Sequence, residues 1–123
     1  MIYSLTIFAF SFCMFFSYLR ANDNNAKVIS KNLANLSIKD IDIVELNEAF
    51  ASQSLACIKD LKINKEIVNI DGGAIALGHP LGATGTRITA KAAQILKREQ
   101  KRYALATQCI GLGQGIATIL ELV

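Results

Sequence analysis

Residues 69–87 have the sequence Asn-Ile-Asp-Gly-Gly-Ala-Ile-Ala-Leu-Gly-His-Pro-Leu-Gly-Ala-Thr-Gly-Thr-Arg, which contains five of the eight glycines of the chain, its only histidine and its only proline. Glycine at this density indicates a backbone that adopts positive φ angles or lies too close to a neighbour for a side chain. Pro80 disfavours a helical conformation at His79, the residue before it. The stretch therefore predicts a short strand and then a rigid loop that presents one imidazole group.

An amphipathic helix is predicted to follow Gly85. Ile88, Ala92, Ile95 and Leu96 recur at the spacing that places apolar side chains on one helical face. Strand and helix patterns alternate along much of the chain, which is typical of a parallel sheet covered by helices on both faces. We therefore expect an α/β fold whose parallel sheet is closed by one antiparallel hairpin.

The other predicted elements follow from apolar periodicity and turn residues. Asn47 has the features of a helix N-cap, because its side chain can accept a hydrogen bond from the free amides of a first helical turn. The elements are a helix within 26–36, a strand at 41–46, a helix from 47 to about 61, a strand at 68–70, a strand at 103–107, a tight turn at 109–113 and a strand at 115–123.

The composition limits the classes of protein to which the chain can belong. Its 123 residues suffice for one domain with one core, and the hydrophobic content of 52% excludes a disordered chain. The net charge of +3 is mild, and no basic run indicates nucleic-acid binding. Cys13, Cys57 and Cys109 are odd in number and form no CxxC pair, so they predict neither a disulfide framework nor a metal site. We expect a reducing, cytoplasmic location.

The amino-terminal segment leaves two interpretations open. Residues 2–19 carry no charge and are rich in Phe, Ile, Leu and Tyr, at the lower limit of length for a membrane-spanning segment. The β-branched and aromatic residues at 2–10 are equally typical of a buried strand. The polar residues 21–25 then predict a turn. We treat residues 1–25 as a leader, either strand or membrane segment, and residues 26–123 as the domain.

Three places carry candidate chemistry. A lone histidine is commonly structural, but the glycines and proline around His79 aim its imidazole at a strand end, where open sheets place their sites. A neutral imidazole can act as a base or donate to an oxyanion. Cys109 alone would be a small buried thiol, but Gly111 offers an unobstructed amide beside it, and the two can provide acid–base and oxyanion functions. Residues 47–50, Asn-Glu-Ala-Phe, predict by themselves only a helix cap and a core phenylalanine.

Taken together, these segments resemble the thiolase family. The three carboxy-terminal signatures of that family are similar to Asn-Glu-Ala-Phe at 47–50, the glycine-histidine-proline stretch at 72–85 and Cys-Ile-Gly at 109–111, in the same order. The resemblance covers about 26–123. It implies one of two similar α/β domains, with a thiolase-type mixed sheet that is mostly parallel and has one antiparallel edge strand.

The resemblance also implies Claisen-type acyl transfer with coenzyme A thioesters, either cleaving 3-oxoacyl-CoA, as in fatty acid β-oxidation, or condensing two acyl-CoA molecules. By that likeness His79 would activate a nucleophilic thiol and help to bind the thioester oxygen, and Asn47 would hold the water that completes this oxyanion site. Cys109 would transfer the proton at the substrate α-carbon. The Gly111 amide would donate to a second oxyanion hole.

Substrate and partners follow from the same resemblance. Ala49 and Phe50 would line the channel for the acyl or pantetheine chain, with no bound cofactor and no metal. The covalent nucleophile of the family is a second cysteine in an amino-terminal domain, so the chain would require that domain or a homo-oligomer and would be inactive alone, as a truncated fragment. Thr84 stands where serine is frequent, and Leu112 where a further glycine is usual. A second hypothesis is a non-catalytic thiolase-fold binding or assembly module, tethered to a membrane by residues 2–19.

Overall fold

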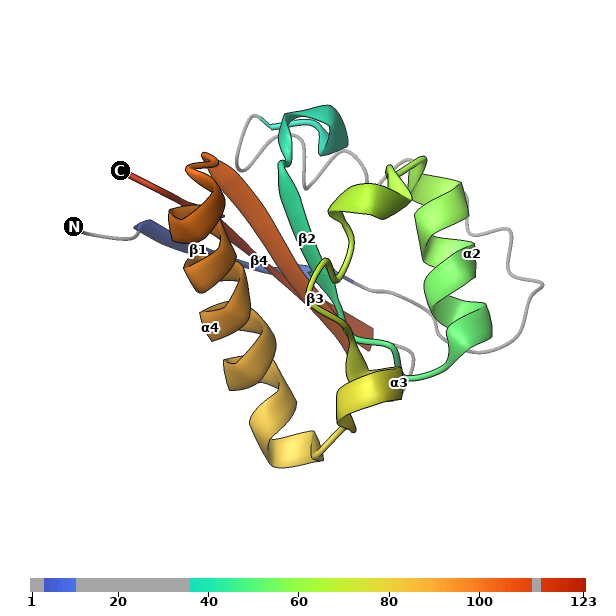
Figure 1. Cartoon of the computed structure of the whole chain (residues 1–123). Coiled ribbons are helices and arrows are strands. Elements are labelled where there is room, and N and C mark those ends of the chain that lie inside the picture. Colours follow the sequence, from blue (N-terminus) through green and yellow to red (C-terminus); the bar gives the residue numbers. More distant parts are fainter. Residues whose placement is uncertain (1–3, 11–35, 112–113) are drawn as a thin grey trace.

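A four-stranded sheet with helices on both of its faces organises the molecule (Figure 1). The computed structural model describes residues 4–10, 36–111 and 114–123. The strands are β1 (Ser4–Phe10), β2 (Ile43–Leu46), β3 (Tyr103–Gly111) and β4 (Gln114–Glu121). Their order across the sheet is β1-β4-β3-β2.

The sheet is mixed, as predicted. Strands β2 and β3 run parallel, whereas β4 runs antiparallel to both of its neighbours, β3 and β1. The predicted position of the antiparallel strand is wrong in one respect, because β4 lies inside the sheet and β1 forms the edge. The hairpin of β3 and β4 leaves one side of β4 free, and residues 4–10 pair with it from Ser4 opposite Glu121 to Phe10 opposite Gly115. Residues 4–10 thus adopt the strand conformation, one of the two interpretations left open for the amino-terminal segment.

Helix α4 (Leu81–Glu99) covers one face of the sheet. Its predicted apolar face is confirmed by four buried side chains: Ile88, Ala92, Ile95 and Leu96. They form one core with Ile43 and with apolar residues of β3 and β4. The helix begins at Leu81, before the predicted start after Gly85, because the Pro80 carbonyl oxygen accepts hydrogen bonds from the amides of Ala83 and Thr84. Proline is well suited to the start of a helix, where its missing N–H costs nothing.

Helix α2 (Ala51–Leu61) lies on the opposite face of the sheet. Its Cys57 is buried in a second core with Val44 and Leu46 of β2. Successive residues of a strand point to opposite faces, so Ile43 and Glu45 point toward α4, while Val44 and Leu46 point toward α2. The predicted coverage of both faces by helices is confirmed.

Asn47 is not the helix N-cap that we predicted. The N-cap residue of α2 is Phe50, and the intervening backbone remains outside the helix. The amide of Asn47 donates to the carbonyl oxygen of Thr107 at 2.9 Å. This bond extends the ladder between β2 and β3 by one residue, and Asn47 therefore belongs to the end of a strand.

Shorter elements complete the described chain. They are the 3-10 turns η1 (Ile38–Asp40) and η2 (Lys65–Ile67) and the one-turn helix α3 (Ala74–Leu77). The strand predicted at 68–70 is reduced to an isolated bridge between Val44 and Val68, because Asn69 adopts a left-handed φ of 48°. Residues 26–35 of the predicted helix lie outside the described residues. In the part of the chain that the structure describes, no helix has the length and apolar character needed to cross a membrane.

Candidate active site

The imidazole of His79 is held at both of its ring nitrogens. Its Nε2 lies 3.2 Å from the side-chain nitrogen of Asn47, which directly follows β2. Its Nδ1 lies 2.7 Å from the hydroxyl oxygen of Thr84, in the first turn of α4. The Thr84 hydroxyl donates to the carbonyl oxygen of Pro80 at 3.1 Å. The structure thus brings two predicted site residues, Asn47 and His79, into direct contact at the carboxyl end of β2.

These contacts favour one tautomer of His79. The Thr84 hydroxyl has a single hydrogen, which it donates to Pro80, so it accepts the hydrogen of His79 Nδ1. The Nε2 atom then carries the lone pair and accepts a hydrogen bond from the Asn47 amide. An imidazole in this form can take a proton at Nε2, as activation of a neighbouring thiol requires.

Asn47 and Thr84 are almost completely buried, with exposed fractions of 1% and 0%. Within the described residues the Oδ1 atom of Asn47 has no hydrogen-bond partner. Leaving a buried amide oxygen without a partner costs free energy, and such atoms are commonly satisfied by an ordered water or a ligand. The site therefore offers an acceptor for a small polar molecule beside the His79 ring.

Other polar atoms are buried without a partner beneath α4, again counting only the described residues: Glu45 Oε1, Arg87 Nε and Gln108 Oε1. Burial raises the pKa of Glu45 to about 7, and the positive charges of Arg87 and Lys91 limit the rise. Glu45 precedes Asn47 by two residues, so both side chains lie on the α4 face of the strand. A buried carboxyl group with a raised pKa thus lies two residues before Asn47 on the same face of the sheet.

Cys109 and Gly111 lie near the carboxyl end of β3, beside the β2 end that carries Asn47. Cys109 lies opposite Gly115 within the ladder, whereas we predicted it in a turn, and its thiol is free and half-buried. The register shifts between Cys109 and Gly111, and such a bulge redirects the backbone. Among the hydrogen bonds of the described residues, none joins Cys109 to Asn47 or His79. The structure therefore brings these residues to one edge of the sheet without linking their side chains.

Ala49 and Phe50 form the extended connection between β2 and α2. The Phe50 side chain is 67% exposed, so it is not the core residue that its sequence position suggests. It belongs to a set of exposed apolar side chains, here named the apolar rim: Phe50, Ile75, Leu77, Leu81 and Ile110. Every member stands within four residues of Asn47, His79 or Cys109 in the sequence. Clustered exposed apolar residues commonly mark an interaction surface.

Three residues that support the site were not among the predicted site residues. Thr84 orients the imidazole, and its side chain lies one helical turn after Pro80. Glu48 and Asn69 hydrogen-bond to each other between the β2 end and the glycine-rich stretch. All three lie inside or beside segments that we had singled out. Their proximity in space depends on the return of the chain to the end of β2, which no local pattern encodes.

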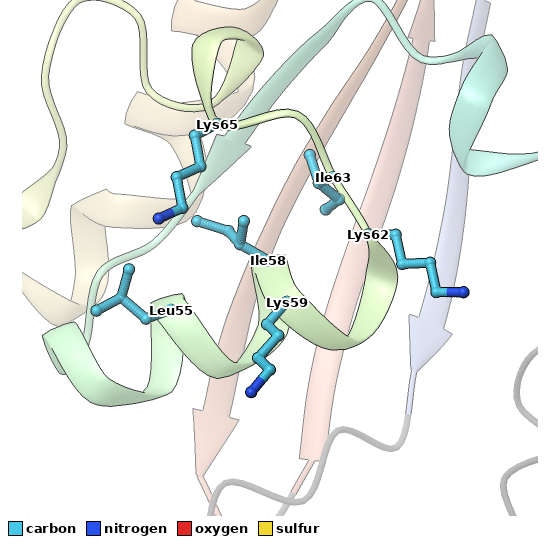
Figure 2. A pocket seen from close by; sticks show the side chains of 6 residues that line it. All are labelled: Leu55, Ile58, Lys59, Lys62, Ile63 and Lys65. Carbon is cyan, nitrogen blue, oxygen red and sulfur yellow. The ribbon is translucent and has the colours of Figure 1, made fainter.

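A surface depression of about 500 Å³ lies along α2 and the turn after it, with Ile58 between Lys59 and Lys65 (Figure 2). It is lined by Leu55, Ile58, Lys59, Lys62, Ile63 and Lys65. Asp60 and Glu66 stand in the same segment and offset part of the lysine charge. No residue of the Asn47–His79 pair or of the apolar rim lines it, so the depression is separate from the candidate active site.

The fold and the site together define an α/β domain that presents an asparagine–histidine pair and a nearby cysteine at the carboxyl ends of its strands. A family model described as "Thiolase, C-terminal domain" matches residues 21–122. Because the match extends over most of the sequence, the chain belongs to the thiolase family. The family resemblance inferred from the three signatures is confirmed.

Curated relatives and solved structures agree with this assignment. The chain is 57% identical over 91 residues to a 3-ketoacyl-CoA thiolase of Vibrio vulnificus (strain YJ016). This match covers 72% of this chain and 24% of the relative. A 3-ketoacyl-CoA thiolase of Serratia proteamaculans (strain 568) is 54% identical over 99 residues, or 78% of this chain and 26% of the relative. The crystal structure of human mitochondrial 3-ketoacyl-CoA thiolase in complex with CoA matches with a TM-score of 0.75 and 49% identity, covering 80% of this chain and 25% of that one. The chain thus spans about a quarter of the length of these relatives.

Proposed function

We propose that the chain provides the acid–base and oxyanion groups of a thiolase that cleaves 3-oxoacyl-CoA or forms it from two acyl-CoA molecules. The observation that carries this proposal is the hydrogen-bonded series from Asn47 to His79 to Thr84, with distances of 3.2 and 2.7 Å. The 3-ketoacyl-CoA thiolases at more than half identity, and the human relative solved with CoA, support a coenzyme A thioester as the substrate.

In this proposal His79 begins the acyl transfer. When the hydrogen bond from the Asn47 amide to Nε2 is released, the Nε2 lone pair takes the proton of a nucleophilic thiol. The thiolate then attacks the 3-oxo carbonyl carbon of the substrate. The protonated Nε2 then donates to the oxygen that becomes negative. A water bound to the orphaned Oδ1 of Asn47 provides a second donor. We assign the thiol itself to an amino-terminal thiolase domain outside these 123 residues, as the family resemblance implies. Of the cysteines that the structure describes, neither Cys57 nor Cys109 has a hydrogen bond to His79.

Cys109 acts on the other product of the cleavage. When the bond between C2 and C3 breaks, its electron pair remains on C2 of the departing acetyl-CoA, and the Cys109 thiol gives its proton to that carbon. The Gly111 amide stabilises the enolate oxygen. The Cys109 thiolate then takes the proton of a CoA thiol, and the CoA sulfur attacks the acyl-enzyme. The departing nucleophile regains its proton from His79 Nε2, and the shortened acyl-CoA is released. Cys109 and Gly111 lie on β3, the strand next to β2, near the end of β2 that carries Asn47, and this position supports the roles proposed for them.

The apolar rim supports a partner surface around this site. Leu81 is 82% exposed and Ile75 is 68% exposed, which is unfavourable for large aliphatic side chains in water. We propose that an amino-terminal thiolase domain covers the rim and supplies the missing thiol, and that Ala49 and Phe50 line the substrate channel between the two parts. The free thiols of Cys57 and Cys109 suit a reducing, cytoplasmic location.

Complementation tests the proposal. The chain is combined with a polypeptide that carries the remaining, amino-terminal part of the Vibrio vulnificus relative, and acetoacetyl-CoA cleavage is measured. We expect turnover from the combination and none from the 123-residue chain alone. Failure to restore turnover in a complex that demonstrably forms would instead favour the non-catalytic binding module.

Variants in the complemented enzyme test the individual roles. His79→Ala and Cys109→Ala should each lower kcat by at least about 10²–10³-fold, the loss typical of removing a single oxyanion donor. Cys57→Ala is the matched control, because that thiol is buried in the α2 core and has no role in the proposed steps, and it should retain turnover. Activity that survives Cys109→Ala would contradict the role assigned to this thiol.

A further inference from the structure

We propose that Glu48 and Asn69 are positioning residues that fix the Asn47–His79 pair by joining the end of β2 to the glycine-rich stretch. The inference rests on the proposed function only for its catalytic consequence. Its structural content is carried by the hydrogen bonds of these two side chains, neither of which has a role in the acyl-transfer steps described above.

Asn69 fastens the backbone next to Asn47. Its Oδ1 accepts the amide of Leu46 at 2.8 Å, and its Nδ2 donates to the carbonyl oxygen of Leu46 at 2.8 Å. The side-chain amide thereby reproduces the paired hydrogen bonds of a neighbouring strand at the point where β2 has no further partner on that side. The left-handed backbone of Asn69 turns the chain away there, and asparagine tolerates this conformation better than most residues.

Glu48 carries the connection to the segment before His79. Its Oε1 accepts from Nδ2 of Asn69 at 3.0 Å, and its Oε2 accepts from the amide of Ile75 at 2.9 Å. A carboxylate is required, because each oxygen serves a different donor. Gly73 leaves room for this carboxylate, since a Cβ atom at that position would overlap it. The conformation of Gly73 is extended, so close approach and not a positive φ accounts for the glycine.

The hydrogen bond from Ile75 to Glu48 affects the position of His79 because only the one-turn helix α3 and its C-cap residue separate the two. Ile75 belongs to α3, which ends at Leu77. Gly78 is its C-cap residue, with a φ of 90°, and His79 follows directly. Glu48 therefore fixes the start of α3 relative to the residue next to Asn47. Together with Thr84 on the far side of the ring, this sets the separation of Asn47 and His79 at 3.2 Å.

Because His79 is the only histidine in the sequence, its imidazole nitrogens can be identified without assignment experiments. Long-range proton–nitrogen NMR spectra of the full chain distinguish the two tautomers. We expect the Nδ1–H form to dominate in the unmodified protein. Glu48→Gln retains the shape of the side chain but loses one acceptor oxygen. In that variant the Nε2–H form should rise to a share on the order of 10% or more.

Two control variants separate positioning from general loss of stability. Glu66→Gln changes an exposed glutamate whose side chain has no hydrogen bond within the described residues, and Ile58→Ala weakens the core beside α2. Both should keep the His79 signals of the unmodified chain. Unchanged His79 signals in Glu48→Gln would overturn the proposal. If Glu48→Gln does not fold, a mixture of tautomers in the unmodified chain would overturn it equally, and a single Nδ1–H form would support it.

The catalytic consequence is measured in the complemented enzyme. Glu48→Gln should lower kcat by up to about 100-fold, the cost of misplacing a reacting group by about 1 Å, with little change in KM. An altered tautomer without turnover in any variant would refute the proposed function and leave the positioning role standing. Normal turnover with a normal tautomer in Glu48→Gln would refute the positioning role alone.

Discussion

The two faces of the sheet are built differently, although the same strands supply both. On the α2 face the buried strand side chains are aliphatic, and Cys57 packs against them. The α4 face has the larger apolar core, but toward the carboxyl ends of its strands it also buries Glu45, Asn47 and Thr84. All four buried polar atoms that lack partners among the described residues belong to this face or to α4.

This difference shows how one sheet serves both stability and chemistry. A core of close-packed apolar side chains stabilises the fold wherever it lies. Buried polar groups without partners oppose folding, and natural proteins retain them mainly where function needs them. The α4 face combines the two: Ile95 and Leu96 near the carboxyl end of the helix provide burial, and the first turn of α4 provides Thr84 for the site.

The largest effect should come from removing apolar volume beneath α4. Ile95 is fully buried, and Ile95→Ala should lower the free energy of unfolding by about 2–5 kcal/mol. The matched change on the other face, Ile58→Ala, should cost about 1 kcal/mol, because Ile58 is only partly buried. Denaturant titration of both variants makes the comparison. Equal losses would show that the two cores contribute alike.

Glu45 should make the α4 face sensitive to pH. Its pKa rises from 4.5 to about 7 on folding, so the folded chain binds the proton more tightly than the unfolded chain. Stability is therefore fully retained below 4.5 and falls as the pH rises toward 7, by about 3 kcal/mol in total for this group. Glu45→Gln should remove that decline and be the more stable protein at high pH. Identical stability–pH curves for the two proteins would contradict the assignment.

Gly73→Ala should disturb the junction between β2 and α3. The added methyl group would overlap the Glu48 carboxylate, and overpacking of this kind costs about 1–3 kcal/mol. Gly82→Ala is the control, since a Cβ atom there meets nothing within 4 Å and alanine favours the helix. Thermal unfolding of the pair should show a loss for the first and no loss for the second. A stable Gly73→Ala protein would mean that the junction is more adaptable than its geometry indicates.

The smallest effect is expected on the outer side of α4. Asp71 pairs with Lys91 at 2.6 Å and with both terminal nitrogens of Arg98 at 2.7 and 3.0 Å, and hydrogen bonds from Arg98 and Lys91 lower its pKa. Its contribution is present above the ordinary pKa of 3.8 and disappears as the pH falls. Asp71→Asn should therefore destabilise the protein slightly at neutral pH, and about 1 M salt should shrink the difference. Asp60→Asn, with no ion pair in the described residues, is the control.

Local patterns predicted the elements whose signals lie within a few turns of chain. The spacing of Ile88, Ala92, Ile95 and Leu96 gave the buried face of α4, and the alternating residues from 41 to 46 gave β2. The pattern could not show that Asn47 continues the ladder, because its partner Thr107 is 60 residues away in the sequence. An asparagine before a helix has the same local signature whether it caps the helix or ends a strand.

The site residues were likewise predicted where a local motif marked them and missed where their role depends on a contact distant in sequence. His79 and Asn47 were proposed from motif residues, and the structure brings them together, while their catalytic roles and those of Cys109 and Gly111 stay predictions. Thr84, Glu48 and Asn69 were missed because each acts through a contact in space. The strand order was also beyond local patterns, because the edge that β1 occupies is created only when β4 joins β3.

That strand order has a consequence for how the chain acquires its structure during synthesis. The first strand in sequence pairs with the last, Ser4 with Glu121, so most of the chain emerges from the ribosome before the sheet can close. Until β3 and β4 appear, the apolar face of α4 has only β2 to cover it. Contacts between segments so distant in sequence slow folding and prolong the exposure of apolar surface. We therefore expect nascent chains arrested before β4 to bind chaperones more strongly than nascent chains that extend past Glu121.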